Sequence, residues 1–507
     1  MARTASDGLF RLIHSLNRTE KGYVKRYCSR HVVGDGNDYL RLFDIIDSQE
    51  QYNEALVKSK LADTAMARRL SAVKNYLYQQ ILEAMRSYHA SSSHERQIVE
   101  LLEDADFLWE KTLYDQAMRR VIRARELAIA HDEYPFWLKT LSWEKNYRHV
   151  VLDEPATDGA EDALSVEQRR VLELLRNTID YENLGNTFHD NLIRSTKGDT
   201  VARDWLKRLP THDLLQSPAT ATARPAKLNY HLILSNWWSF VGDDPDRSVG
   251  HTQALVDLMM SDDELRNARP DTFLGILYNH AVANASEQRS QQFAATMSLL
   301  WDEDHGHPSR NIEVKRYYRA VNAECTYALH TGDHSRILGR MAFIREKFDG
   351  CSEFIPPQSR VALCFMCGRI AHEHRRNRES DWWFRRLSMC DDSIRPDLHA
   401  AARMLQLQRA MMDRDVDYVR PAVRTLRRFL QSYNLTSTRT DAILSLFRRY
   451  AESHGLSSAR LIADTARRLA GTSPSSSFDP VSNSGIDAWI LASRPSTAKT
   501  LQPAFNI

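Results

Sequence analysis

Apolar side chains recur every three or four residues along most of the chain, and this spacing is the feature that most limits its fold. In residues 66–89, Leu70, Val73, Leu77 and Ile81 follow one another in this way, which places them on one face of an α-helix. Glycine occurs only 18 times and proline 16 times in 507 residues, whereas sheets need many glycine-containing tight turns. Alternating strand patterns do not persist anywhere. The sequence therefore predicts an all-α protein.

The charge of the chain is nearly balanced overall but uneven along its length. A formal net charge of +2 gives no overall field that marks a nucleic-acid-binding protein. Residues 1–31 and 420–470 are nevertheless basic, the latter with ten arginines, whereas residues 100–110 and 153–162 are acidic. Separated patches of opposite sign can join two copies of a chain as readily as they bind DNA. The oligomeric state is therefore left open.

Cysteine content and hydropathy indicate the compartment. Six cysteines in 507 residues are too few for a disulfide framework. The first residues, MARTASDGLFRLIHSL, lack the continuous apolar core of a signal peptide. No segment approaches the roughly 18 uncharged apolar residues that span a membrane. We therefore expect a reduced, cytoplasmic protein that has no membrane partner.

Three regions differ in composition. Residues 1–92 are expected to form a compact, basic helical module, and residues 93–470 a long series of helices separated by short breaks. Residues 471–507 are rich in serine, proline and threonine, which is typical of a disordered tail. Within this tail, the stretch IDAWILAS at 486–493 is apolar enough to dock on a partner or on the body of the protein.

Parts of the central region repeat in the manner of tetratricopeptide helix pairs, in which small residues let two helices approach closely. Three such repeats can be aligned, whereas residues 150–310 yield none. The first repeat contains Leu101, Ala105, Leu108, Ala117, Val121 and Ala124. The second contains Cys325, Ile337, Met341 and Ile344, with Gly332 and Asp333 at its turn, and the third contains Gly368, Ala371, Ser380, Phe384 and Leu387. Stacked pairs of this kind form a right-handed α-solenoid, which is the architecture that we expect.

Four stretches near the two ends of the helical body are the most characteristic of the chain: LFRLIHSLNRTEKGYVKRYCSRH, YLRLFDIIDSQ, KNYLYQQILEAMRSYH and YVRPAVRTLRRFLQSYN. Together they resemble an uncharacterised family of long helical, tetratricopeptide-like proteins from Bacteroidota and related bacteria. The resemblance covers most of the chain. It implies a bacterial cytoplasmic solenoid, and it implies no activity because the family brings no catalytic motif.

Three short motifs could carry chemistry, but each has a simpler structural explanation. Cys364 and Cys367 lie inside an expected helix without a second cysteine pair, which favours buried structural cysteines over a zinc or redox site. The acidic and histidine-rich stretch 302–307 precedes a proline, a pattern that is typical of a solvated loop rather than a metal site. His372 and His374 are two apart, unlike the i, i+4 histidines of zinc proteases. No P-loop, GxGxxG, GxSxG or HExxH motif occurs, so we expect no catalytic residue, no metal and no cofactor.

A solenoid of helix pairs presents a groove that is lined by the first helix of each repeat. The register of the repeats directs six side chains toward this groove: Trp109, Arg319, Asn322, Thr326, Arg369 and His372. Arginine and asparagine in such a groove can hold the carboxylates and the backbone of a peptide. We therefore predict a non-enzymatic scaffold or adaptor that binds a protein or peptide partner.

The basic N-terminal module supports an alternative hypothesis. A helix at residues 18–31 carries five cations that could contact phosphate groups, as in a divergent helix–turn–helix: Arg18, Lys21, Lys25, Arg26 and Arg30. The same charges also fit a solvated helix face, or a patch that docks on an acidic repeat. The alternative function is therefore a nucleic-acid-binding regulator whose repeats sense a partner.

Overall fold

The computed structural model describes residues 7–30, 38–62, 65–88, 94–152, 162–196, 199–242, 244–302, 309–455, 458–472 and 479–492. Every regular element in these ranges is a helix, so the all-α prediction is confirmed. The chain divides into two compact units, Met1–Leu175 (unit 1) and Arg176–Ile507 (unit 2). None of the described helices is long and apolar enough to cross a membrane.

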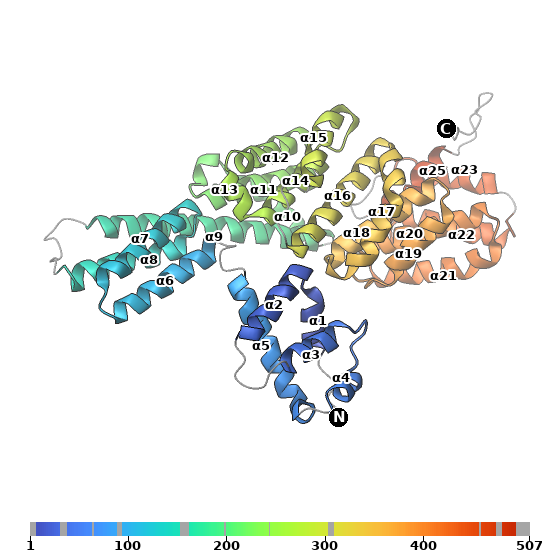
Figure 1. Ribbon diagram of the computed structural model, residues 1–507. Helices are drawn as coiled ribbons and strands as arrows, with labels where there is room; N and C mark the ends of the chain where they lie inside the picture. The colour runs from blue at the N-terminus through green and yellow to red at the C-terminus, as the bar shows by residue number, and fades with distance from the viewer. Residues whose placement is uncertain are drawn as a thin grey trace. The chain divides into compact units, whose positions relative to one another are not determined.

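The described residues of unit 1 include two small helical cores. Its helices are α1 Gly8–Ser15, α2 Arg18–Arg30, α3 Asp38–Asp47, α4 Glu54–Lys60, α5 Leu70–Tyr88, α6 His94–Glu110, α7 Tyr114–Ala130, α8 Tyr134–Val150 and the first part of α9 Ala163–Thr196 (Figure 1). Helices α1 to α5 enclose one core, in which Ile13, Leu42 and Leu77 have no exposed surface. Ala117 and Val121 of α7 belong to the second core.

Unit 2 contains the rest of α9, from Arg176, and the helices that follow it. These are α10 Thr200–Arg208, α11 Arg224–Phe240, α12 Pro245–Met260, α13 Asp263–Ala268, α14 Pro270–Ala283, α15 Ser290–Trp301, α16 Arg310–Thr331, α17 Ser335–Cys351, α18 Pro357–Glu373, α19 Asn377–Ser388, α20 Pro396–Met412, α21 Val416–Ser432, α22 Thr438–Glu452, α23 Ser458–Leu469, α24 Pro480–Ser484 and α25 Ile486–Ala492. Short 3-10 turns accompany them in the two units: η1 Ala65–Arg69, η3 Leu209–Thr211, η4 Asp213–Leu215, η5 Pro218–Thr220, η6 Glu287–Arg289 and η7 Ser352–Phe354.

Among the described residues of unit 2, three hydrophobic cores follow one another. The first is built from α11 to α16, the second from α16 to α20 and the third from α20 to α25. Consecutive cores share a helix, first α16 and then α20, so the packing continues from one core into the next. Helix α16 packs on α18, and α18 on α20, while α19 and α21 pack on α18 and α20 as their second helices.

The residues of the three predicted repeats lie where paired helices meet. Ala105, Ala117, Cys325 and Ser380 have no exposed surface. A Cβ added at Gly368 would lie only 2.5 Å from the Phe384 ring, so a larger residue there would force α18 and α19 apart. The small residue at position 368 thus sets the distance between α18 and α19, whereas the tetratricopeptide-like arrangement as a whole stays a prediction.

Local signals explain where several helices begin and end. Pro225, Pro245, Pro270 and Pro396 lie in the first turn of α11, α12, α14 and α20. Proline is tolerated at this position because the first N–H groups of a helix have no partner within it. Gly332 ends α16 with a φ of 76°, a left-handed conformation that glycine adopts without strain.

The prediction of a disordered tail is wrong for residues 479–492. These residues form α24 and α25, and Val481, Ile486 and Ile490 have no exposed surface. The serine- and proline-rich composition is misleading here because a few apolar side chains find a complementary surface on the body of the protein. The apolar stretch therefore docks on the body of the protein, which is one of the two alternatives that its composition allows. Residues 493–507 lie outside the described residues.

Candidate peptide-binding site

Residues 479–492, which we call the C-terminal segment, lie on the last helices of unit 2. Helix α24 packs along α20 and contacts α22, whereas α25 packs on α23 and α20; Figure 1 shows the short helix α25 beside α23. Val481, Ile486 and Ile490 are buried in the core that these helices share. Burying an aliphatic side chain of this size stabilises docking by about 2 kcal/mol. The segment thus resembles a bound apolar peptide.

Arg439, in the first turn of α22, is the charged centre of this contact. Its side chain is 7% exposed, and its guanidinium lies 2.8 Å from the Asp479 carboxylate and 2.6 Å from that of Asp487. It also donates hydrogen bonds to the Ser482 hydroxyl and the Thr472 carbonyl. Because a guanidinium presents five N–H donors in one plane, a single arginine on the body holds both helices of the segment.

Further polar contacts hold the end of α24. The Asn483 amide donates to Asp397 Oδ2 at 3.0 Å, and Arg395 donates two hydrogen bonds to the same carboxylate. Arg369 of α18 donates to the Asn483 carbonyl at 2.7 Å. A Cβ at Gly485 would lie 2.8 Å from the Arg369 guanidinium, and the φ of Gly485 is +70°. Glycine is therefore required there both by the close approach and by the backbone.

Arg369 and His372, which the sequence places in the groove, thus lie at or near this site. Besides the Asn483 carbonyl, Arg369 binds Glu373 at 2.8 Å. His372 Nε2 lies 3.2 Å from Gln408 Oε1 of α20. Burial lowers the pKa of His372, so its ring is neutral at pH 7. Both side chains already have partners within the chain: Arg369 binds the segment, and His372 binds α20.

A pair of histidines extends the polar network around Arg369. His334 Nδ1 and His374 Nε2 are 2.7 Å apart, and His334 Nε2 lies 3.6 Å from Glu373. Burial lowers the pKa of His334, although the negative charge of Glu373 opposes this effect. His372 and His374 therefore have different partners, as their separation of two residues predicts.

Arg319, Asn322 and Thr326, the predicted groove residues of α16, lie in a different environment. Arg319 and Lys315 both bind the carboxylate of Asp271 in α14, at 2.8 and 2.6 Å. Burial of Asp271 alone would raise its pKa, but the two cations outweigh burial and lower it. Asn322 is only 5% exposed, and the Thr326 hydroxyl donates to the Asn322 carbonyl. These groups stabilise the helix packing, and their role in partner binding stays a prediction.

Trp109 belongs to unit 1, where it is half-buried at the end of α6. Its ring meets Tyr114 and Trp143 edge to face, with centroids 4.8 and 5.3 Å apart. Such contacts stabilise aromatic pairs beyond the burial of their area. Trp109 therefore joins α6, α7 and α8, and its predicted role in binding a peptide is not tested.

The basic helix of the alternative hypothesis is α2. Its five predicted phosphate-binding residues are Arg18, Lys21, Lys25, Arg26 and Arg30. Lys21 binds Asp47 at 2.6 Å, and Lys25 binds Asp44 at 2.6 Å, both in α3. Arg18 and Arg26 are exposed, whereas the side chain of Arg30 lies outside the described residues. Carboxylates of α3 thus neutralise two of the five cations, and nucleic-acid binding by α2 stays a prediction.

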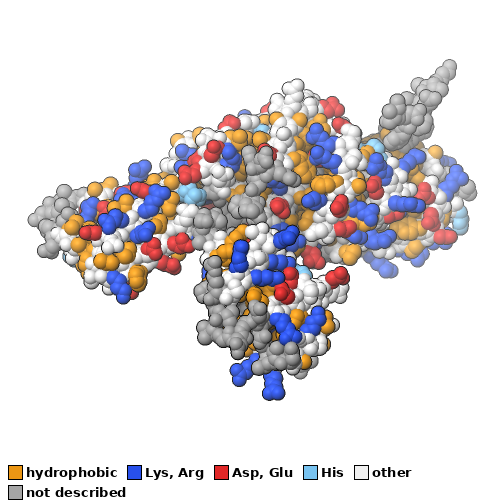
Figure 2. All heavy atoms as spheres, viewed as in Figure 1, with side chains coloured by type: hydrophobic (Ala, Val, Ile, Leu, Met, Phe, Trp, Pro, Cys, Tyr) orange, Lys and Arg blue, Asp and Glu red, His pale blue; other side chains and the backbone are white. Residues whose placement is uncertain are grey.

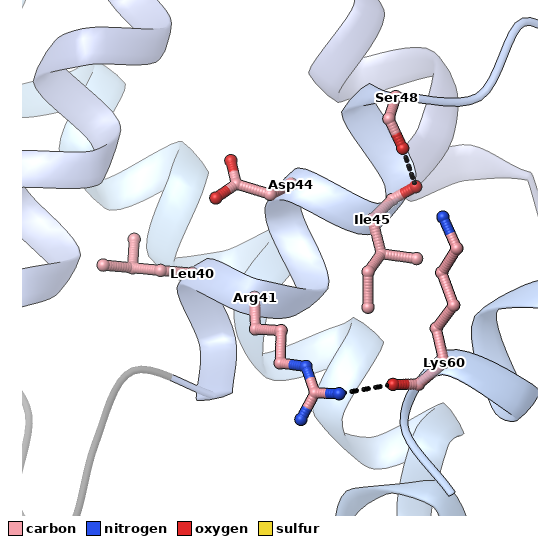
Figure 3. Close-up of a pocket in the computed structure, with 6 residues that line it drawn as sticks. All are labelled: Leu40, Arg41, Asp44, Ile45, Ser48 and Lys60. Atoms are coloured by element: carbon pink, nitrogen blue, oxygen red, sulfur yellow. Dashed lines mark hydrogen bonds between the residues drawn. The ribbon is translucent and has the colours of Figure 1, made fainter.

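A pocket of about 590 Å³ lies between α3 and α4 (Figure 3). It is lined by Leu40, Arg41, Asp44, Ile45, Ser48 and Lys60. Arg41 donates to the Lys60 carbonyl at 2.8 Å, Ser48 donates to the Ile45 carbonyl at 3.0 Å, and Asp44 binds Lys25. Ligand sites usually contain polar groups that converge on one point. Here the polar groups are engaged with the protein itself, which makes the pocket a weaker candidate than the C-terminal site.

The cysteines are free thiols, and their environment is structural. Cys364 and Cys367 have no exposed surface, as expected, and Cys367 Sγ lies 3.8 Å from Cys325 Sγ. Burial raises the pKa of Cys364, so it stays protonated. Across the described ranges, no group of three or more His, Cys, Asp or Glu side chains is placed to hold a metal ion. Most of the stretch 302–307, namely residues 303–307, lies outside those ranges.

The comparisons with known proteins give no family for this chain. No protein-family model matches it, and no curated protein or solved structure matches it significantly. The resemblance to helical proteins of Bacteroidota therefore stays a prediction.

Proposed function

We propose that the chain is a non-enzymatic scaffold or adaptor, built as a tetratricopeptide-like, right-handed α-solenoid, whose last helix pairs bind a short helical segment of a protein. One observation carries the proposal: α18, α20 and α22 already hold such a segment, residues 479–492, through charged side chains that surround an apolar contact. The predicted groove residue Arg369 takes part in this contact.

The contacts of the C-terminal segment define the chemistry of a partner. Ile486 and Ile490 supply aliphatic anchors, and Asp479 and Asp487 supply the carboxylates that Arg439 binds. Amphipathic helices bind grooves in this manner, with anchors three or four residues apart. We expect the partner to present a short helix with branched aliphatic residues and an aspartate or glutamate at its start.

In this proposal the C-terminal segment occupies the site until a partner replaces it. A tethered ligand has an effective concentration in the millimolar range, so a partner peptide must bind tightly or in several places to compete. A variant that weakens the segment without altering the site would therefore reveal the binding of a peptide added in solution.

The experiment uses the full-length chain with Ile490→Asp and a fluorescent peptide of residues 479–492. Asp at the fully buried position 490 releases the segment and leaves Arg369, Asp397 and Arg439 intact. We expect the peptide to bind this variant at least about tenfold more tightly than the wild type, because the tethered competitor is removed. Fluorescence anisotropy measures both affinities.

Leu491→Asp is the matched control, since Leu491 is 41% exposed and its replacement leaves the segment docked. Adding Arg439→Ala to the Ile490→Asp variant removes the charged centre of the site and should abolish peptide binding. The proposal fails if the peptide binds neither protein while circular dichroism shows that both are folded, because the segment is then a fixed part of the core.

We further propose that the protein acts in a reducing, bacterial cytoplasm. A reducing compartment keeps cysteines as thiols, which agrees with the six free cysteines of the chain. The alternative function, a regulator that binds nucleic acid through α2, has weaker support, because Lys21 and Lys25 are bound to carboxylates of α3.

A further inference from the structure

Helix α21 exposes a row of arginines that has no counterpart in the peptide-binding site. Arg420, Arg424, Arg427 and Arg428, which we call the arginine stripe, are all exposed. Their spacing of four, three and one residues places them on one side of the helix. The opposite side, with Val419 and Leu426, is buried against the neighbouring helices. In Figure 2, Lys and Arg side chains are visible over this part of unit 2.

The arginine stripe takes part in no ion pair with any residue that the structure describes. Asp381, a carboxylate close to Tyr418 at the start of α21, is already bound by Arg409. Asp417 is the one acidic residue of α21 itself. Four guanidinium groups therefore face solvent with a single acidic residue on their own helix. Exposed positive charge of this density attracts a polyanion.

The size of the stripe fits the backbone of a nucleic acid. Eight residues of helix separate Arg420 from Arg428, which corresponds to about 12 Å. One strand of a duplex presents a phosphate about every 3.4 Å of its axis, so about four phosphates lie along this length. Arginine also suits phosphate oxygens better than lysine does, because its planar fork can bind two of them at once.

An acidic protein fits the stripe less well. Protein interfaces contain a buried apolar centre surrounded by polar groups. Tyr418 is the large apolar side chain of α21 that is clearly exposed, at 44%, and its position along the helix directs it away from the stripe. We propose that the arginine stripe binds the phosphate backbone of double-stranded nucleic acid without reading its sequence. This function is separate from peptide binding on α18, α20 and α22.

The test uses the full-length protein and a fluorescent DNA duplex of arbitrary sequence, with an RNA duplex of the same sequence as a second probe. Each phosphate contact contributes about 0.9 to the slope of log affinity against log salt, so four contacts predict a slope of about −3.6. Between about 50 and 200 mM NaCl the affinity should then fall about 150-fold. The two probes distinguish DNA from RNA as the natural ligand.

The variant Arg424→Gln, Arg427→Gln, Arg428→Gln should retain a slope of only about −0.9, so that the same change in salt weakens binding about threefold. The matched control, Arg203→Gln, Lys207→Gln, Arg208→Gln on α10, removes the same charge from another exposed helix and should bind as the wild type does. Replacing the three α21 arginines with lysine should restore most of the salt dependence.

Three results would overturn the proposal. The first is that the wild type binds neither duplex at low salt. The second is that the α21 variant and the wild type bind equally while their circular dichroism spectra agree. The third is that poly-glutamate competes as well as duplex DNA, since the stripe would then recognise an acidic protein.

Discussion

Helices α2 and α21 are both rich in cations, yet they differ in what surrounds these charges. On α2, Lys21 and Lys25 lie 2.6 Å from carboxylates of α3. On α21, the arginine stripe has no ionic partner in the described part of the chain. The difference arises from the neighbouring helices: α3 supplies aspartates that bind two cations of α2, whereas the helices packed on α21 place no described carboxylate within ion-pair distance of the arginine stripe. A basic helix is therefore a binding surface only when its own fold leaves its charges unpaired.

The largest loss of stability is expected from replacing Arg439, whose ion pairs are the most completely buried of those compared. Arg439→Met leaves the carboxylate of Asp479, which is 3% exposed, without its cation. Breaking a buried pair in this way costs about 3–5 kcal/mol. The matched variant Arg424→Met, on the arginine stripe, should change stability by no more than about 0.5 kcal/mol. Thermal unfolding measures both. If the two variants are equally destabilised, Arg424 has a structural partner and the contrast between paired and unpaired arginines is lost.

The sequence predicts much of the helix packing because that packing depends on local spacing. Gly368, Ser380 and Phe384 belong to one repeat pattern and meet between α18 and α19. Likewise, Trp237 and Trp383 are buried while their neighbours Trp238 and Trp382 are partly exposed, because adjacent residues of a helix point to different sides of it. Periodicity determines which face of a helix is apolar, and an apolar face that is long enough has to be covered.

The candidate site could be predicted only in part. The register of the repeats places Arg369 in a groove, but its contact with Asn483 joins residues 114 positions apart in the chain. Arg439 carries no local signal at all, because its partners Asp479 and Asp487 lie in a segment whose composition indicates disorder. Ion pairs between distant segments depend on tertiary contacts, and the spacing of residues along one helix does not reveal these contacts.

Lowering the pH from 7 to 5 should reduce the stability of unit 2 and leave the positive charge of α21 unchanged. Burial, then the charges of His231 and Arg247, lower the pKa of His251 to about 4, compared with 6.5 for an ordinary histidine. The folded protein therefore binds fewer protons than the unfolded chain between these values, so stability is complete above about pH 6.5 and falls toward pH 4. Because His251 is partly exposed, we expect a loss of about 1 kcal/mol between pH 7 and pH 5.

Chemical denaturation at the two pH values measures this loss, and His251→Gln should reduce the pH dependence. Arginine keeps its charge over this range, so duplex binding by the arginine stripe should not change as long as the protein stays folded. A denaturation midpoint that is equal at pH 7 and pH 5 contradicts the effect assigned to His251.

Removing the acidic partners of α2 should leave its cations unpaired, as those of α21 are. In the variant Asp44→Asn, Asp47→Asn, the cations Lys21 and Lys25 lose their ion pairs. If unpaired charge is what creates a phosphate-binding surface, the salt dependence of duplex binding should steepen by up to about 2 in slope. The stability should fall by less than about 1 kcal/mol for each exposed pair. Unchanged binding would show that the geometry of α2, and not its pairing, excludes nucleic acid.

The smallest change in stability is expected from replacing the cations of α2 themselves. Lys21 and Asp47 are each 25% exposed, and such a pair contributes about 0.5 kcal/mol because solvent screens it. Lys21→Ala should therefore lower the thermal midpoint slightly, whereas Arg18→Ala, at an exposed position of the same helix, should leave it unchanged. Neither variant should weaken duplex binding, since both leave the four cations of the arginine stripe intact. A clear loss of duplex affinity in Lys21→Ala would instead place the nucleic-acid site on α2 and restore the helix–turn–helix hypothesis.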